Sequence, residues 1–337
     1  PGKGILLNAN EAPWPLLPPE QSDNTALNRY PDPQPAQLLS RLAGLYGVKE
    51  EQLLITRGSD EGIDLLTRVF CRAGIDSILH CPPTFGMYRI AAQAQGAAIV
   101  SIARDEADFS LQEDAVLQAV KSDRRIKLVF LTSPNNPTGD VLADGFLERL
   151  LATASGRALI VVDEAYAEFC AQTSAAALVE NNEHLVVLRT MSKAWAAAGL
   201  RCGSVIAQPS VIALLRRVIA PYPLPAPVIS LALLMLEPPM LEKQRDMLEK
   251  ISLNKTFLLE ILGRSGSIRD VVPGEANFVL IRVDEPNNLL KFCAQRNVIL
   301  REFPSDPALH GWVRISVGSH SDLAQFEQAL IEWEKSQ

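Results

Sequence analysis

Lys193 is the residue whose neighbours point most clearly to a chemistry. It follows the apolar run at residues 185–188, with Thr190 and Ser192 before it and Arg201 eight positions after it. An apolar pocket keeps a lysine amine partly neutral, as a Schiff base to a carbonyl compound requires. The two hydroxyl groups and the planar guanidinium suit a phosphate group. A lone lysine after a strand is usually a solvated charge, so it is the whole segment that predicts a Schiff-base lysine beside a phosphate anchor.

A second pair of polar residues follows the apolar run at residues 158–162. Asp163 ends that run, and Tyr166 stands three positions later. Ligands of open α/β sheets bind beyond the carboxyl ends of the strands. A carboxylate at such an end can pair with a protonated ring nitrogen. The alternative is that Asp163 caps a helix, and this segment alone does not distinguish the two.

Two turn-like loops lie at other predicted strand ends. Residues 133–139 hold two prolines, two asparagines and a glycine, a composition that taken alone is typical of an ordinary turn. Residues 57–62 connect a predicted strand to a predicted helix. Their glycines let the backbone approach a ligand, and the N–H groups of a first helical turn suit a phosphate. Taken alone this is a weak signal, but beside Ser192 and Arg201 we expect the segment to supply the main-chain part of one phosphate site.

The composition is that of a soluble enzyme with an acidic surface. The chain has 337 residues, enough for two domains, and its net charge of −7 disfavours nucleic acid as a partner. The five cysteines and four histidines show no metal-ligand spacing, so we expect free thiols and no metal site. No secretory signal opens the chain, and the most apolar region is interrupted by Arg216, Arg217 and several prolines. We therefore expect a cytoplasmic protein without a membrane span.

Short apolar runs that alternate with amphipathic segments predict an α/β fold, with a mainly parallel sheet between two layers of helices. The predicted strands are 53–56, 77–81, 126–131, 158–162, 185–188 and 204–207; the predicted helices are 35–46, one from 59, 86–95, 111–121 and 144–154. Proline-rich residues 220–227 mark a boundary. Helices at 240–262 and 323–334 and strands at 276–282 and 312–317 then predict a smaller α+β domain. We predict an N-terminal arm over 1–34, a large domain over 35–220 and a small domain over 221–337.

These segments together resemble the fold-type I aminotransferases that use pyridoxal 5'-phosphate (PLP). Within that group the chain is most similar to the histidinol-phosphate aminotransferases, and the resemblance covers nearly all of it. The segments that carry it are 7–11, 28–32, 81–88, 133–139, 163–169, 189–203 and 219–224. The resemblance implies that Lys193 holds PLP and acts as general base and acid. It also implies a reaction in histidine biosynthesis, in which an amino group moves between L-histidinol phosphate and 2-oxoglutarate, giving imidazole acetol phosphate and glutamate.

The resemblance further implies how the cofactor is held. Asp163 would pair with the ring nitrogen, Asn136 and Tyr166 would hydrogen-bond the ring oxygen, and Phe85 would stack on the ring where many relatives have tyrosine. Because the loop must turn sharply to aim Asn136, we expect a cis bond between Asn136 and Pro137. The implied cofactor-binding residues are Lys193, Ser59, Asp60, Phe85, Asn136, Asp163, Tyr166, Ser192, Arg201 and Tyr30, of which Lys193, Asp163 and Tyr166 are also the implied catalytic residues.

Substrate binding and assembly are implied in the same way. Arg314 matches the family arginine that binds the substrate carboxylate in a bidentate pair, and Arg301 is a candidate for a second anionic group. Either could instead be a surface arginine on a strand edge. Asn10 and Tyr30 would complete the substrate site, with Tyr30 reaching the site of the partner subunit in a homodimer. The chain begins only a few residues before Asn10, so we expect a shorter N-terminal arm than is usual in the family.

Two alternatives stay open at this point, and a third is disfavoured. A threonine-phosphate decarboxylase has the same fold and a similar phosphorylated substrate, and an aromatic amino acid aminotransferase of this fold would use other donors. Segments 81–88 and 219–224 favour the histidinol-phosphate enzymes over the decarboxylase. A regulator that uses such a domain as a ligand sensor would need a DNA-binding domain and a basic surface, which an acidic chain of this length does not supply.

Overall fold

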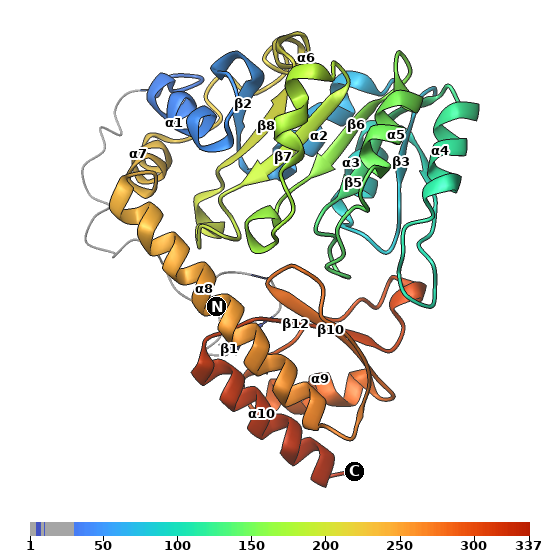
Figure 1. The fold of residues 1–337 in the computed structure, drawn as a ribbon, viewed down its shortest axis with the longest axis vertical. Coiled ribbons are helices and arrows are strands. Elements are labelled where there is room, and N and C mark those ends of the chain that lie inside the picture. The colour runs from blue at the N-terminus through green and yellow to red at the C-terminus, as the bar shows by residue number, and fades with distance from the viewer. Residues whose placement is uncertain (1–4, 8–9, 11–29) are drawn as a thin grey trace.

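The large domain is built on a seven-stranded sheet. A computed structural model of the chain describes residues 5–7, 10 and 30–337, and Figure 1 shows them as a larger and a smaller body. The strand order in the large sheet is β2-β8-β7-β6-β5-β3-β4. Among these seven strands β8 runs antiparallel to both of its neighbours, β2 and β7, and the other neighbouring pairs are parallel. The strands are β2 Leu53–Thr56, β3 Ser77–His80, β4 Ala98–Ser101, β5 Ile126–Thr132, β6 Leu159–Asp163, β7 Leu185–Thr190 and β8 Gly203–Ala207.

Helices cover both faces of this sheet because successive strand side chains alternate between the faces. Val129 and Leu131 of β5 pack in one buried cluster, whereas Leu128 and Phe130 pack in another. The first cluster includes α1, α4 and α5, and the second includes α2, α3 and α6. The bounds are α1 Ala36–Tyr46, α2 Gly58–Phe70, α3 Met87–Gln95, α4 Glu113–Ser122, α5 Phe146–Ala154 and α6 Pro209–Leu215. Strands buried on both faces are apolar along their whole length, which is why the sequence predicts them.

The small domain contains an antiparallel sheet in the order β12-β10-β9. Its elements are β9 Ile268–Val272, β10 Phe278–Val283, α9 Pro286–Gln295, β11 Val298–Ile299, β12 Trp312–Ser316 and α10 His320–Lys335. The N-terminal strand β1, Ile5–Leu6, pairs in parallel with β11. Other parts of the predicted arm, including residues 8–9, 11 and 28–29 of the family segments, lie outside the described residues.

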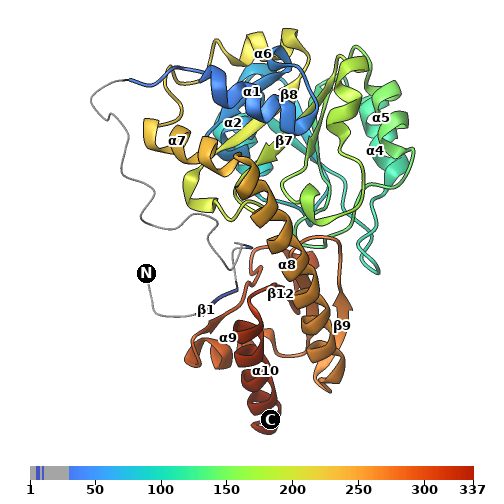
Figure 2. The ribbon, with the colours of Figure 1, turned by 60° about the vertical axis from the view of Figure 1, so that its left-hand side comes forward.

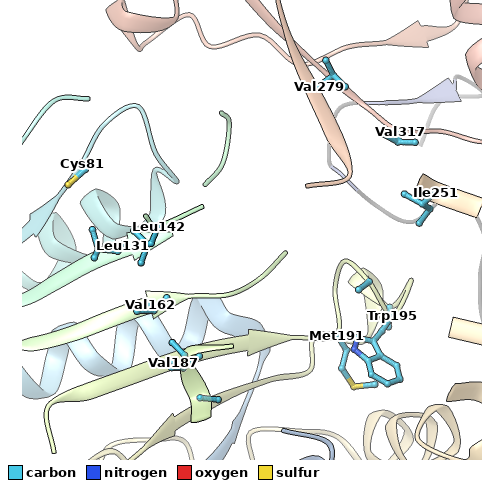
Figure 3. Packing of buried hydrophobic residues seen from close by; sticks show 14 of the residues in the cluster. Cys81, Leu131, Leu142, Val162, Val187, Met191, Trp195, Ile251, Val279 and Val317 are labelled. Carbon is cyan, nitrogen blue, oxygen red and sulfur yellow. The ribbon is translucent and has the colours of Figure 1, made fainter. Parts of the chain in front are cut away.

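A single long helix runs from one body to the other. α8, Pro238–Arg264, starts beside the large domain and ends within the small one, as both views show (Figures 1 and 2). α7, Ala226–Met235, lies beyond the predicted boundary at residue 220 and packs against α1. The position of that boundary stays a prediction. One hydrophobic cluster includes Val162 and Val187 of the large sheet and Val279 and Val317 of the small domain (Figure 3).

The predicted α/β class is confirmed, and the six predicted strands of the large domain match the observed ones to within two residues at each end. The sequence did not predict β1, β4, β9, β11, α6, α7 or α9. Among the described helices none combines the length and the apolar character that crossing a lipid bilayer requires.

Candidate active site

The predicted site residues of the large domain gather at one edge of its sheet. Thr132, Asp163 and Thr190 end the neighbouring parallel strands β5, β6 and β7. The carboxyl ends of parallel strands meet at the same edge, and this is where ligands bind in open α/β sheets. In Figure 1 that edge of the large domain faces the small domain. The loops after these three strands are the ones that carry the predicted chemistry.

Asp163 is a buried carboxylate held by neutral donors. Its Oδ1 accepts the backbone N–H of Ala165 at 3.1 Å, and its Oδ2 accepts the hydroxyl of Tyr88 at 2.8 Å. Burial raises the pKa of Asp163 to about 6, against the opposing effect of these two hydrogen bonds. The 3-10 helix that follows begins only at Ala167, so Asp163 does not cap it. A buried carboxylate of this kind suits a cationic partner such as a protonated ring nitrogen.

Lys193 lies in a loop whose neighbouring residues are buried in the hydrophobic core. The neighbouring Met191 and Trp195 are buried in the main hydrophobic cluster (Figure 3). The N–H of Met191 donates to the carbonyl of Cys202 at 2.9 Å, which closes the loop at its base. The Nζ of Lys193 lies 5.9 Å from the ring centre of Tyr166. The structure therefore brings the predicted Schiff-base lysine to the end of β6, near the residues that follow Asp163.

The predicted phosphate site also comes together. Arg201 donates to Ser192 Oγ at 3.1 Å and to Asp60 Oδ2 at 3.2 Å, linking the lysine loop to the first turn of α2. Ser59 lies in the same first turn and is buried. The guanidinium lies so close to Gly58 that a Cβ there would stand 2.5 Å from Arg201 Nη2. Hydroxyl groups, a guanidinium and the N–H groups of a helix start are the donors that a phosphate needs.

Two predicted residues from distant segments meet at the hydroxyl of Tyr166, and a third joins them through Asn136. Asn10 Nδ2 donates to Tyr166 Oη at 3.1 Å, and Asn136 Nδ2 approaches the same oxygen at 3.5 Å. Arg314 of β12 donates to Asn136 Oδ1, so the small domain is hydrogen-bonded directly to this group. The peptide bond between Asn136 and Pro137 is cis, as the sequence predicts. Two further cis bonds, Pro82–Pro83 and Ser133–Pro134, were not predicted.

Backbone pairing in the small domain puts Asn10 in this position. Leu7 donates to Ile299 and accepts from Ser316, at 2.9 and 3.1 Å, so the N-terminal segment lies between β11 and β12. Asn10 then receives a hydrogen bond from Asn277 Nδ2 on its carbonyl at 3.0 Å. Its φ of 53° lies in the left-handed region, which asparagine tolerates better than most residues.

The two predicted arginines of the small domain lie side by side. Arg301 and Arg314 exchange backbone hydrogen bonds of 3.1 and 2.9 Å, and both guanidinium carbons lie 5.8 Å from the ring centre of Phe303. Arg314 is buried, and burial lowers its pKa to about 10, with Tyr166 acting in the opposite direction. Arg301 is exposed. A buried and an exposed guanidinium at one place can bind anions of different length.

Phe85 lies close to the other predicted site residues, whereas Tyr30 lies on the surface. Phe85 is half-buried and packs edge-to-face on Tyr88, the hydrogen-bond partner of Asp163, with ring centres 5.7 Å apart. Tyr30 is 82% exposed and stacks on Tyr222, with ring centres 4.6 Å apart and an interplanar angle of 16°. Within this chain Tyr30 therefore does not join the other predicted residues.

Sequence reasoning missed a buried ion-pair network behind the site. Arg189 of β7 pairs with Glu164 and with Glu168, each at 2.8 Å. Trp195 Nε1 donates to the same Glu168 carboxylate at 3.4 Å. The network ties the segment after Asp163 to the lysine loop, and a buried arginine within an otherwise apolar strand was the signal that could have revealed it. Elsewhere, the described residues include no group of three or more histidine, cysteine or acidic side chains that could hold a metal ion.

Known proteins are similar to this chain in sequence and in architecture. The profile of the family described as aminotransferase class I and II matches residues 3–330. The chain is 40% identical to the histidinol-phosphate aminotransferase of Serratia proteamaculans (strain 568) over 326 residues, 97% of this chain and 88% of that one. It is 42% identical to that of Aeromonas hydrophila over 324 residues, 96% and 89% of the two chains. The fold is similar to the crystal structure of histidinol-phosphate aminotransferase from Sinorhizobium meliloti in complex with pyridoxal-5'-phosphate, with a TM-score of 0.86, 21% identity and coverage of 98% and 90%.

Proposed function

Because the chain belongs to the class I and II aminotransferases, and within them to the histidinol-phosphate aminotransferases, we propose that it transfers an amino group between L-histidinol phosphate and 2-oxoglutarate in histidine biosynthesis. The observation that carries the proposal is the meeting of Lys193, Asp163 and the Ser192–Arg201 phosphate site at one sheet edge. These are the groups that a PLP enzyme needs. The crowding of Gly58 against Arg201 and the donors around Ser192 fit the phosphate of PLP.

Each group has a distinct task in the proposed reaction. When bound, PLP takes up the electron pair that is released at the substrate Cα. Asp163 balances the positive charge on the ring nitrogen, which keeps the ring able to accept those electrons. Lys193 would hold the cofactor covalently and, once the substrate amine displaces it, would act as general base and acid and move a proton between the substrate Cα and the cofactor carbon. Tyr166 and Asn136 donate to the ring oxygen and fix the plane of the ring.

Two substrates must use one anion site in turn. The donor carries a phosphate and the acceptor carries carboxylates, and both would be bound by Arg314 and Arg301. Their guanidinium groups lie beside the same Phe303 ring, one buried and one exposed, which supports a site that accepts both anions. A buried guanidinium that already donates to Asn136 would also hold the substrate next to the cofactor ring.

A substrate panel tests this function. Purified enzyme with PLP is assayed for transamination of histidinol phosphate, phenylalanine and tyrosine, and for carbon dioxide release from threonine phosphate. We expect kcat/KM for histidinol phosphate to exceed that for either aromatic amino acid by at least about a hundredfold, because the phosphate contacts are lost with those donors. Release of carbon dioxide at a comparable kcat/KM would assign the chain to the decarboxylases instead.

We also propose that the enzyme is a homodimer with shared active sites. α7 is apolar on all sides, yet its fully buried residues are Ala232 and Met235. A helix that is apolar all round is normally buried. The exposed Tyr30–Tyr222 stack adds to the apolar surface. A second copy of the chain would cover these groups and place Tyr30 near the partner's phosphate site.

The proposed compartment is the cytoplasm. All five cysteines are free, and four of them are buried. Reduced thiols are the normal state of cysteine in a reducing compartment. Localisation of a tagged chain in its host would test this point.

A further inference from the structure

Tyr88 is the one side chain that hydrogen-bonds Asp163 among the described residues. Its hydroxyl lies 2.8 Å from Asp163 Oδ2 and 2.7 Å from Thr132 Oγ1, and the tyrosine has no exposed surface. The ring is fixed by stacking on Phe130, with ring centres 4.8 Å apart, and by the edge contact with Phe85. Both neighbours hold the phenol in a single orientation, so the direction of its hydroxyl is set by packing rather than by the hydrogen bond alone.

The surrounding hydroxyl groups determine where the phenol proton points. Thr84 Oγ1 donates to Asn135 Oδ1 at 2.8 Å and lies 3.2 Å from Thr132 Oγ1. The Thr132 hydroxyl has a single proton, which it donates to Tyr88 across 2.7 Å if Tyr88 donates its own proton to Asp163. The Asp163 carboxylate has no proton to give when it is ionised, so Tyr88 donates to it. Burial raises the pKa of Tyr88 well above its ordinary value, which keeps the phenol protonated.

Asp163 and its neighbour Glu164 are stabilised in opposite ways. Glu164 is paired with the buried guanidinium of Arg189 at 2.8 Å, so its charge is balanced within the protein. Within the part of the chain that the structure describes, Asp163 accepts from two neutral donors, the hydroxyl of Tyr88 and the N–H of Ala165. A neutral donor stabilises a buried carboxylate without neutralising its negative charge, whereas an arginine in the same place would neutralise it. A carboxylate supported by neutral donors can therefore balance the positive charge of a bound ligand.

We propose that Tyr88 is a positioning residue, whose hydroxyl keeps the Asp163 carboxylate ionised and aimed at the ring nitrogen of the cofactor. The proposal rests on the proposed PLP-dependent function. According to this proposal, the Tyr88 hydroxyl affects cofactor binding only through the ring nitrogen. Loss of the hydroxyl should therefore weaken the binding of a cofactor that has this nitrogen and leave unchanged the binding of one that lacks it.

The experiment compares two cofactors on the apoenzyme. PLP and 1-deaza-PLP, in which a C–H group replaces the ring nitrogen, are titrated into wild type, Tyr88→Phe and a control, Tyr46→Phe. The control loses the hydroxyl of a tyrosine in the same domain, whose ring centre lies 5.0 Å from the guanidinium carbon of Arg189. A hydrogen bond to a charged group is worth a factor of about ten to a hundred in affinity. We expect Tyr88→Phe to raise the Kd for PLP by that factor, to leave the Kd for 1-deaza-PLP within about twofold, and Tyr46→Phe to change neither.

The outcomes separate this proposal from the proposed function. Equal weakening for both cofactors, or a PLP preference kept intact in Tyr88→Phe, would overturn the role of Tyr88 alone. A wild type that binds PLP and 1-deaza-PLP equally would overturn it together with the role of Asp163. If Tyr88→Phe does not fold, Thr132→Val gives a second route, because it removes the hydroxyl that donates to Tyr88. We expect the same selective loss for PLP in this variant, smaller in size, and its absence would also overturn the proposal.

Discussion

Gly203 packs its α-carbon directly against the backbone of Gly58. A Cβ atom on Gly203 would lie 2.5 Å from the carbonyl carbon of Gly58 and 2.7 Å from the backbone nitrogen of Ser59. Because real Cβ atoms do not approach so closely, β8 and the start of α2 can come together only where glycine stands. This contact fixes the first turn of α2, whose N–H groups belong to the proposed phosphate site.

Gly203→Ala should therefore push the first turn of α2 away and weaken PLP binding. We expect the Kd for PLP, measured by titrating the apoenzyme, to rise at least about tenfold, since phosphate contacts of this kind are charge-assisted. Gly199→Ala is the matched control, because no atom lies within 4 Å of a Cβ at that position of the same loop. An equal effect of the two substitutions would argue against a role for the Gly203–Gly58 contact.

Lys193→Ala should abolish turnover and leave the fold intact. The residue supplies both the covalent link to the cofactor and the moving proton, and loss of a general base alone costs a factor of about 10² to 10⁴. The variant should also lack the absorption band of a lysine-bound cofactor at neutral pH. Lys250→Ala, at an exposed position of α8, should retain both activity and the band. Retention of the band by Lys193→Ala would remove the lysine from its proposed role.

Asp163→Asn should stabilise the apoenzyme at neutral pH. The carboxyl titrates near 3.8 in an unfolded chain and near 6 when buried. Between these pH values the folded state binds more protons, so wild-type stability falls as pH rises and the penalty is complete above about pH 6. We expect the variant to gain at most about 3 kcal/mol in urea unfolding at pH 7. The gain should vanish below pH 4 and be missing in the surface control Asp64→Asn. In the holoenzyme the same variant should lower kcat.

Arg314→Lys should weaken the binding of both substrates. A lysine keeps the charge and loses the planar pair of donors, so we expect KM for histidinol phosphate and for 2-oxoglutarate to rise at least about tenfold. Arg282→Lys is the control, because Arg282 lies on the adjacent strand, is exposed and pairs with Asp270 at 3.4 Å. An unchanged KM for 2-oxoglutarate would contradict the proposed shared anion site.

A mixed dimer tests the shared site. Tyr30→Phe and Lys193→Ala subunits are combined, and the heterodimer is isolated with two different tags. If Tyr30 serves the partner's site, one site carries both lesions and the other carries none, so about half of wild-type activity should return. If Tyr30 serves its own subunit, each site keeps one lesion, and activity stays at or below the Tyr30→Phe level.

Much of the fold was predictable because the large sheet is covered on both faces. The strand Leu185–Thr190 is buried at every residue, and its first four residues, 185–188, form an uninterrupted apolar run. The edge strand Ala98–Ser101 is only partly covered and gives no such signal. α7 was missed because its prolines suggested a break. Pro225 is its N-cap and Pro227 lies in its first turn, where a missing N–H group costs no hydrogen bond.

The site residues that directly follow strand ends were predictable, whereas the contacts between residues far apart in the sequence were not. Lys193 and Asp163 could be found because each follows an apolar run. The contact between Tyr88 and Asp163 joins residues 75 positions apart, and that between Arg314 and Asn136 joins residues 178 apart. Such pairs depend on how helices and domains pack, which local spacing does not encode.

α8 joins the two domains as one continuous helix and not as a flexible linker. Its 27 residues span about 40 Å without a break. One inserted residue would turn everything beyond it by about 100° and shift it by about 1.5 Å. Such an insertion would carry Arg314 out of reach of Asn136. Chimaeras that exchange the small domain between relatives must therefore keep the length of this helix, and tolerated insertions and deletions should be found on either side of it.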